Sequence, residues 1–213
     1  MKLSDLERTK NVLEFYALTN KLKAIIREGW KQWRVSADRV ESIAEHVYST
    51  CMLAIAIDSE FNYGVDLYKV VFMLAIHELE EIIIGDITPF SDLKDKKCNG
   101  RAAVAKILGK LVKAKEISSI IDEYVANETK EAKFAKWVDK LDAGLQCKIY
   151  DMGGFIDISG TDKDTQARIS LENVHHERLS DTWLEHHTQK YNFDETFTRI
   201  AHHARNDKNW PVD

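Results

Sequence analysis

The fold is indicated most clearly by residues 66–86, which read DLYKVVFMLAIHELEEIIIGD. The segment opens with an aspartate, a residue suited to capping a helix, and apolar residues dominate the turns that follow. The glycine at position 85 and the nearby Pro89 end the helical pattern. We therefore predict a helix from Asp66 to about Ile84, whose second half carries a histidine and several acidic residues.

The rest of the chain has the same helical character. Only 2 prolines and 9 glycines interrupt 213 residues. Helical spacing of apolar residues recurs at about residues 6–26, 42–59, 101–113, 116–128, 130–152, 164–191 and 194–205, whereas residues 30–39 and 90–99 read as loops. No repeat or linker divides the chain, so we predict one all-α domain, residues 1–213, with a C-terminal helical extension at about 160–213.

Composition and charge argue against several classes of protein: nucleic-acid-binding, membrane-spanning and secreted proteins. The net charge is -5 and no long basic run is present, so we do not expect nucleic-acid binding. The apolar runs are too short to span a bilayer, so we expect no membrane insertion. The 3 scattered cysteines read as reduced thiols, and the N-terminus lacks the pattern of a signal peptide. These features predict a cytoplasmic protein.

Three separated segments hold residues suited to metal chemistry: Glu45-His46, the stretch from His77 to Asp86, and Asp139 to Asp142. A divalent transition metal favours imidazoles and carboxylates that converge from different elements, and packed helices can bring them together. Glu81 lies i+4 from His77 on a helix, where it can handle a proton beside a metal. The residues alone leave two interpretations open. They can form one metal site together, or each can be an ordinary core or surface residue.

At these segments the chain resembles the HD-domain family of metal-dependent phosphohydrolases, in particular its 5′-deoxynucleotidase branch. The resemblance rests on ESIAEH at 41–46, HELEEIIIGD at 77–86 and VDKL at 138–141, in that order, and covers roughly residues 20–150. It implies an HD-domain helical bundle with one divalent ion, which is Co, Mn, Zn, Fe, Ni or Mg. The ligands that it implies are His46, His77, Glu78 and Asp139.

The resemblance also implies a substrate and its contacts. In that branch the substrates are nucleoside 5′-monophosphates, commonly the deoxy forms, hydrolysed to nucleoside and phosphate. We expect Glu81 and Asp86 to be catalytic, through proton transfer and the orientation of water or sugar. The expected substrate-binding residues are Trp30, Arg27, Arg34, Asp86, Ile87, Thr88 and Pro89. Similar HD proteins are often dimers, which implies a homodimer here.

The chain departs from the branch at two places. The family's paired His-Asp is His77-Glu78 here, and the extra methylene shifts the ligand oxygens by about 1 Å. The branch often has arginine directly before the upstream tryptophan, but Gly29 precedes Trp30. Either Arg27 or Arg34 can therefore be the arginine that holds phosphate.

Two alternative functions stay open on the sequence. One is hydrolysis of another phosphoester, such as a nucleoside triphosphate, because substrate choice depends on pocket shape. The other is a helical regulatory protein with a decayed site, which Glu78 in place of aspartate favours. Three histidine pairs, at 175–176, 186–187 and 202–203, diverge in direction on a helix, so we expect structural or surface roles for them.

Overall fold

The structure, a computed structural model, describes residues 3–86, 96–156, 176 and 178–209, without the side chains of residues 32 and 96–98. Within these ranges the chain is helical, and extended pairing consists of two isolated bridges, Ile26–Ser42 and Val35–Ile156. The all-α prediction is confirmed for this part of the chain. The predicted contacts Ile87, Thr88 and Pro89 lie outside the described residues, as does His175.

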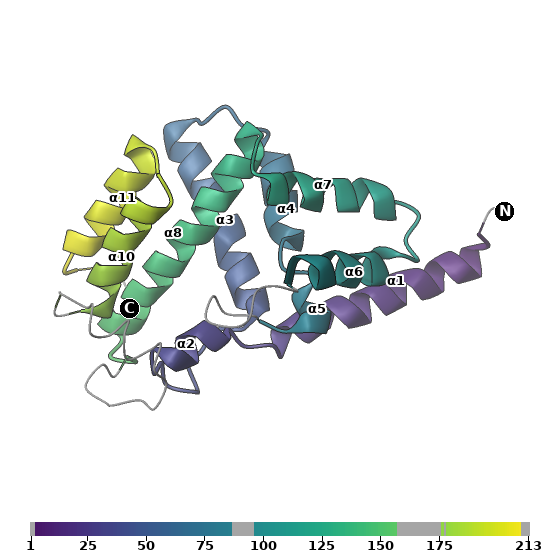
Figure 1. Cartoon of the computed structure of the whole chain (residues 1–213), viewed down its shortest axis with the longest axis horizontal. Coiled ribbons are helices and arrows are strands. Elements are labelled where there is room, and N and C mark those ends of the chain that lie inside the picture. The colour runs from purple at the N-terminus through teal and green to yellow at the C-terminus, as the bar shows by residue number, and fades with distance from the viewer. Residues whose placement is uncertain (1–2, 87–95, 157–175, 177, 210–213) are drawn as a thin grey trace.

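One long helix, α8, is the centre of the molecule. Helices α3, α4, α7, α10 and α11 all contact it, and Figure 1 shows α10 and α11 on one side of α8, α4 on the other, and α3 crossing it. The elements are α1 (Asp5–Thr19), the 3-10 helix η1 (Asn20–Lys23), α2 (Glu28–Gln32), α3 (Ile43–Phe61), α4 (Leu67–Ile76), α5 (Glu81–Ile84), α6 (Lys96–Leu108), α7 (Ala114–Ala126), α8 (Lys130–Met152), α10 (Leu179–Lys190) and α11 (Glu195–Asn206).

Side-chain caps fix where the helices near the site begin. Ser42 Oγ accepts the backbone N–H of Glu45 at 3.3 Å, and the Glu45 carboxylate accepts the backbone N–H of Ser42 at 2.6 Å, which completes a capping box. This box starts α3 and places His46, which is fully buried, in its first turns. Asp66 caps α4 as predicted, through the N–H of Lys69 at 3.1 Å.

The predicted continuous helix over residues 66–84 is wrong in one respect, because it breaks after Ile76. Residues 77–80 form turns, and a short helix, α5, follows. The His77 side chain explains the break, since its Nδ1 lies 2.6 Å from the carbonyl oxygen of Leu74. A straight helix uses that carbonyl for the N–H of Glu78, so the imidazole competes with the helical ladder.

The predicted loop at residues 30–39 also contains structure, because α2 extends to residue 32. Asp86 Oδ2 accepts the backbone N–H of Glu28, in the first turn of this helix, at 2.7 Å. A carboxylate at this position satisfies an otherwise unpaired helix N–H and favours the helix dipole. The short helix is thus stabilised by a residue 58 positions away.

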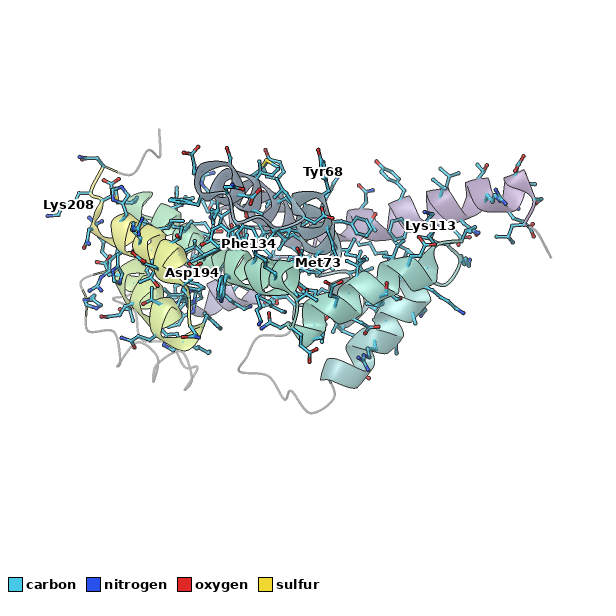
Figure 2. All side chains as sticks on the ribbon, turned by 90° about the horizontal axis from the view of Figure 1, so that it is seen from above. Tyr68, Met73, Lys113, Phe134, Asp194 and Lys208 are labelled. Atoms are coloured by element: carbon cyan, nitrogen blue, oxygen red, sulfur yellow. The ribbon has the colours of Figure 1, made fainter. Side chains whose placement is uncertain are left out.

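The main core lies between α8 and the helices around it. Met73 of α4 and Phe134 of α8 are almost completely buried, and Figure 2 shows them in the interior of the bundle. A second cluster packs Trp30 and Trp33 against Tyr150 and Leu179. Burial of side chains of this size contributes about 1.5–3 kcal/mol each. These two clusters join α2 and α10 to α8.

Helix α1 is the exception to this packing. It has no buried residue and projects from the body of the molecule (Figure 1). Its apolar residues Val12, Leu13 and Tyr16 are 61–64% exposed. None of the described helices is both long and apolar enough to cross a membrane.

Candidate metal centre

The four predicted metal ligands converge from three parts of the fold. His46 comes from α3, His77 and Glu78 from the turns after α4, and Asp139 from α8. Each offers a donor atom, and these four atoms lie within 4.8 Å of one another. His46 Nε2 is 3.4 Å from Asp139 Oδ1 and 3.8 Å from Glu78 Oε1, and His77 Nε2 is 3.4 Å from Glu78 Oε1.

This geometry fits one divalent ion. Ligands about 2.1 Å from a shared ion lie about 3.0–4.2 Å apart, which includes most of the observed separations. Nε2 of His46 and Nε2 of His77 are buried without a hydrogen-bond partner among the described residues. Such buried, unsatisfied nitrogens are costly, and a cation between them and the carboxylates removes that cost.

Each histidine is oriented by an acceptor on its other ring nitrogen. His46 Nδ1 lies 2.8 Å from Asp142 Oδ2, and His77 Nδ1 lies 2.6 Å from the carbonyl oxygen of Leu74. With a proton on each Nδ1, both Nε2 lone pairs face the cluster, as metal-binding histidines require. Asp142 was part of the third sequence segment, but the sequence did not indicate this role.

Asp139 presents one oxygen to the cluster. Its Oδ2 accepts the Tyr124 hydroxyl at 3.0 Å and the Lys140 ammonium at 2.9 Å, which leaves Oδ1 facing His46. Tyr124 belongs to α7, and no sequence motif pointed to it. Its helical position on the apolar face of α7 was the one available signal, and many core residues share that signal.

The electrostatics favour an anionic cluster. Burial acts to raise the pKa of Asp139, but Lys140 and the two histidines outweigh it and hold that pKa well below its usual range. Burial likewise opposes ionisation of Glu78, whose pKa is nonetheless lowered by His77, His46 and Arg27. A cation needs nearby negative charge and imidazoles that are neutral or can release a proton.

The two histidines differ in charge. Burial and Arg27 act to lower the pKa of His46, but the nearby carboxylates of Asp139 and Asp142 prevail and raise it to about 9. Burial lowers the pKa of His77. A cation bound at the cluster would therefore have to displace a proton from His46.

Arg27 lies at the edge of the cluster. Its Nη1 lies 4.0 Å from Glu78 Oε1 and its Nε lies 3.8 Å from Glu41 Oε1. Arg27 and Glu78 each have side chains that are 19% exposed, so they form the more open edge of the site. Arg34 lies in the turn that follows α2, with φ of 57°.

Three other predicted site residues, Glu81, Asp86 and Trp30, are not among the four clustered donors. Glu81 is buried in the first turn of α5. Asp86 is bonded to the backbone of α2, as described above. Trp30 is only 2% exposed and its indole N–H donates to Glu41 Oε1 at 2.8 Å, so its ring packs inside the aromatic cluster and not on an open surface.

The histidine-rich tail does not form a second metal site in the described residues, where one candidate metal cluster is found. His176 pairs with Glu185 at 2.6 Å, and Arg205 pairs with the same carboxylate at 3.4 Å. His187 is buried against Trp183 and Tyr191. These positions are consistent with the structural roles expected for them.

Comparison with known proteins agrees with this geometry. Residues 19–192 match the HD-domain family. The 5′-deoxynucleotidase HDDC2 of Dictyostelium discoideum is 31% identical over 150 residues, which cover 66% of this chain and 78% of that protein. The human protein of the same name is 29% identical over 147 residues, which cover 67% of this chain and 69% of that protein.

A solved structure gives a similar result. The crystal structure of a predicted metal-dependent phosphohydrolase from Magnetospirillum magnetotacticum MS-1 superposes with a TM-score of 0.67 at 26% identity. The match covers 96% of this chain and 94% of the other. Since the family match spans most of the sequence and the site residues gather as the motifs require, the chain belongs to the HD-domain family.

Proposed function

We propose that the protein is a metal-dependent phosphohydrolase that converts (deoxy)nucleoside 5′-monophosphates to nucleoside and phosphate. The observation that carries this proposal is the convergence of His46, His77, Glu78 and Asp139 beside Arg27. The names of the relatives support the substrate class. An arginine at the open edge of a cation site suits a phosphate monoester, which carries two negative charges at neutral pH.

In this mechanism the four clustered residues would hold one divalent ion. When bound, such an ion supplies Lewis-acid chemistry that activates water and neutralises phosphate charge. Arg27 binds the phosphate oxygens and orients the ester. Glu81 takes a proton from the attacking water, whose oxygen forms the new bond to phosphorus. The bond from phosphorus to the 5′ oxygen breaks, and that oxygen receives the proton from Glu81, which returns to its carboxylate form as nucleoside leaves. Asp86 orients water or sugar.

The test uses purified protein with cobalt, manganese or zinc and a panel of deoxynucleoside and nucleoside monophosphates. Phosphate release is followed, and metal content is measured by elemental analysis. Glu81→Ala should abolish turnover while metal stays bound, and Glu116→Ala, an exposed control on α7, should leave turnover unchanged. If Glu81→Ala retains full turnover, the role assigned to Glu81 is wrong.

The same experiment separates the alternatives. Preferential release of phosphate or pyrophosphate from triphosphates or from non-nucleotide esters assigns a different substrate on the same scaffold. A protein that purifies without stoichiometric metal and takes none up is a regulatory protein with a decayed site. One observation argues against a decayed site. Although glutamate is longer than aspartate, Glu78 Oε1 lies 3.4–3.8 Å from the Nε2 atoms of both histidines.

We further propose that residues 1–213 act as a single HD-type domain in the cytoplasm, with a metal-site core at about 20–150 and the C-terminal helices as an extension. The free, buried cysteines Cys51 and Cys147 support a reducing compartment. Cell fractionation tests the location. Folding of a chain truncated before α10 tests whether the extension is separable.

We propose that two copies associate through the face formed by α1, α3 and α4, which lie on one side of the molecule with Tyr68 at its edge (Figure 2). These three helices carry large apolar side chains that are exposed by 40–92%: Leu6, Val12, Leu13, Tyr16, Tyr48, Met52, Ile55, Tyr68 and Phe72. Exposed apolar surface on this scale marks an interaction site. A homodimer buries it symmetrically.

Light scattering after size-exclusion chromatography tests the dimer. Tyr68→Glu together with Leu13→Glu should give a monomer. Val125→Glu is the matched control, because Val125 is 45% exposed on α7, which is not part of this face. A monomeric wild-type protein at micromolar concentration would rule out this dimer.

A further inference from the structure

Glu41 is a buried carboxylate beside the metal centre that no part of the proposed mechanism uses. It is only 6% exposed, in contact with the aromatic cluster of Trp30 and Tyr150. Burial of an ionised carboxylate costs several kcal/mol unless charged or hydrogen-bonding partners compensate it. The partners of Glu41 therefore indicate why a carboxylate is present here.

Those partners meet on one oxygen. Glu41 Oε1 accepts the indole N–H of Trp30 at 2.8 Å and lies 3.8 Å from Nε of Arg27. The other end of the same guanidinium points toward Glu78. Arg27 thus lies between a carboxylate outside the metal cluster and a carboxylate inside it.

The backbone around Glu41 is fixed independently of its side chain. The N–H of Arg27 donates to the carbonyl of Glu41 at 3.0 Å, and the N–H of Ile43 donates to the carbonyl of Ile25 at 2.8 Å. The N–H of Glu41 donates to the Tyr150 hydroxyl at 3.0 Å. Because the backbones of Arg27 and Glu41 are both held, the remaining conformational freedom is that of the long Arg27 side chain.

The Trp30 ring is held by α10. It stacks on Trp183 with ring centroids 4.9 Å apart and an interplanar angle of 24°, and it meets Tyr150 edge-on at 5.1 Å. An aromatic ring packed on two sides has a fixed N–H direction, so its hydrogen bond to Glu41 is fixed too. A chain of contacts runs from Trp183 through Trp30 and Glu41 to Arg27.

We propose that Glu41 is a positioning residue that aims Arg27 at the phosphate of the substrate, and that Trp30 and Trp183 act by holding Glu41. This inference rests on the proposed function, because it takes Arg27 as the phosphate ligand. It assigns Trp30 a role behind the site, in keeping with its burial. It also gives α10 a part in catalysis through packing.

Glu41→Gln is the informative substitution, because glutamine can still accept the Trp30 N–H but no longer carries the charge that holds Arg27. KM for the nucleotide should rise about tenfold with a much smaller change in kcat, since Arg27 holds phosphate before and during the reaction. Metal content should stay stoichiometric. Glu185→Gln is the matched control, because Glu185 also pairs with an arginine and a ring N–H but lies on α10 near Arg205.

A double-mutant cycle with Arg27→Ala tests whether the effect passes through Arg27. In that background Glu41→Gln should change KM by less than about twofold, because the group that it positions is gone. Independent, additive effects of the two substitutions overturn the proposal. So does an Arg27→Ala variant with an unchanged KM, even if the protein is a nucleotidase.

A measurement without substrate separates this inference from the proposed function. The Nε–H resonance of Arg27, assigned through its loss in Arg27→Ala, should be sharp in the wild type and broadened by exchange in Glu41→Gln. An identical resonance in both proteins overturns the positioning role. If no ester is hydrolysed, the proposed function fails, and affinity for inorganic phosphate by calorimetry replaces KM in the comparison.

Discussion

At the scale of single residues, three of the four cluster side chains have a second contact that fixes their direction. His46 and His77 use their Nδ1 atoms, and Asp139 uses Oδ2. Outer contacts of this kind commonly change metal affinity 10- to 100-fold when removed. The cluster is therefore organised before an ion arrives.

Tyr124→Phe removes one such contact and little else. The hydroxyl donates to Asp139 Oδ2 in a buried place, so its loss frees the carboxylate to rotate. We expect the dissociation constant for the metal to rise about tenfold, measured by competition with a chromogenic chelator. Tyr63→Phe is the control, because that hydroxyl also donates to a carboxylate, Asp194, but far from the cluster. Equal affinities in Tyr124→Phe and wild type would contradict the role.

Sequence identified the cluster residues but not their supports. His46, His77, Glu78 and Asp139 fall in ordered motifs, and the structure brings them together. The parts played by Tyr124 and Glu41 depend on which helices become neighbours, and spacing along the chain carries no such information. The proximity of Arg27 to Glu78 could not be read from the sequence for the same reason.

At the scale of helices, the crossing of α8 and α10 is close at Gly144. A Cβ atom there would lie 2.8 Å from Leu184 Cδ2 and 3.3 Å from His187 Nδ1. We expect Gly144→Ala to lower the free energy of unfolding by about 1 kcal/mol, because overpacking outweighs alanine's better helix propensity. Urea denaturation measures it. Gly29→Ala, with no atom within 4 Å of its Cβ, should be neutral or slightly stabilising.

His187 makes the same helix pair sensitive to pH. Burial, with His186 and Lys140 nearby, lowers its pKa to about 3. The unfolded chain takes up a proton near pH 6.5 and the folded chain does not, so stability falls as pH drops below that value. Between pH 7.5 and 5.5, wild type should lose about 1.4 kcal/mol more than His187→Phe. Equal losses, measured by denaturant titration at both pH values, would show that His187 is not the cause.

Helix prediction succeeded where local signals decide and failed where distant contacts do. The predicted helix at 130–152 matches α8, whose start Thr129 caps. The break after Ile76 depends on a histidine side chain competing for a carbonyl, and α2 depends on Asp86. The predicted helix at 6–26 is right as far as Thr19, where α1 ends and the 3-10 helix η1 follows. The lack of burial of α1 was not readable from the sequence.

At the scale of the whole molecule, one ion would join α3, the turns after α4, and α8. Removing it leaves anionic groups facing one another and loses the stabilisation that binding provides. With ion present at about 100 times its dissociation constant, chelation should lower Tm by about 5–10 °C. Differential scanning calorimetry with and without EDTA measures this change. The Tm of His46→Gln should not change when EDTA is added. A wild-type Tm that is the same with and without EDTA would count against the metal site.

The unequal exposure of the four ligand side chains has a kinetic consequence. His46 and His77 are 0% and 2% exposed and Asp139 is 6% exposed, whereas Glu78 is 19% exposed. Exchange of the ion with solvent is therefore easiest past Glu78, on the side of the site where Arg27 lies. A nucleotide held there obstructs that route, so product should depart first and the ion should have a longer residence time during turnover than at rest.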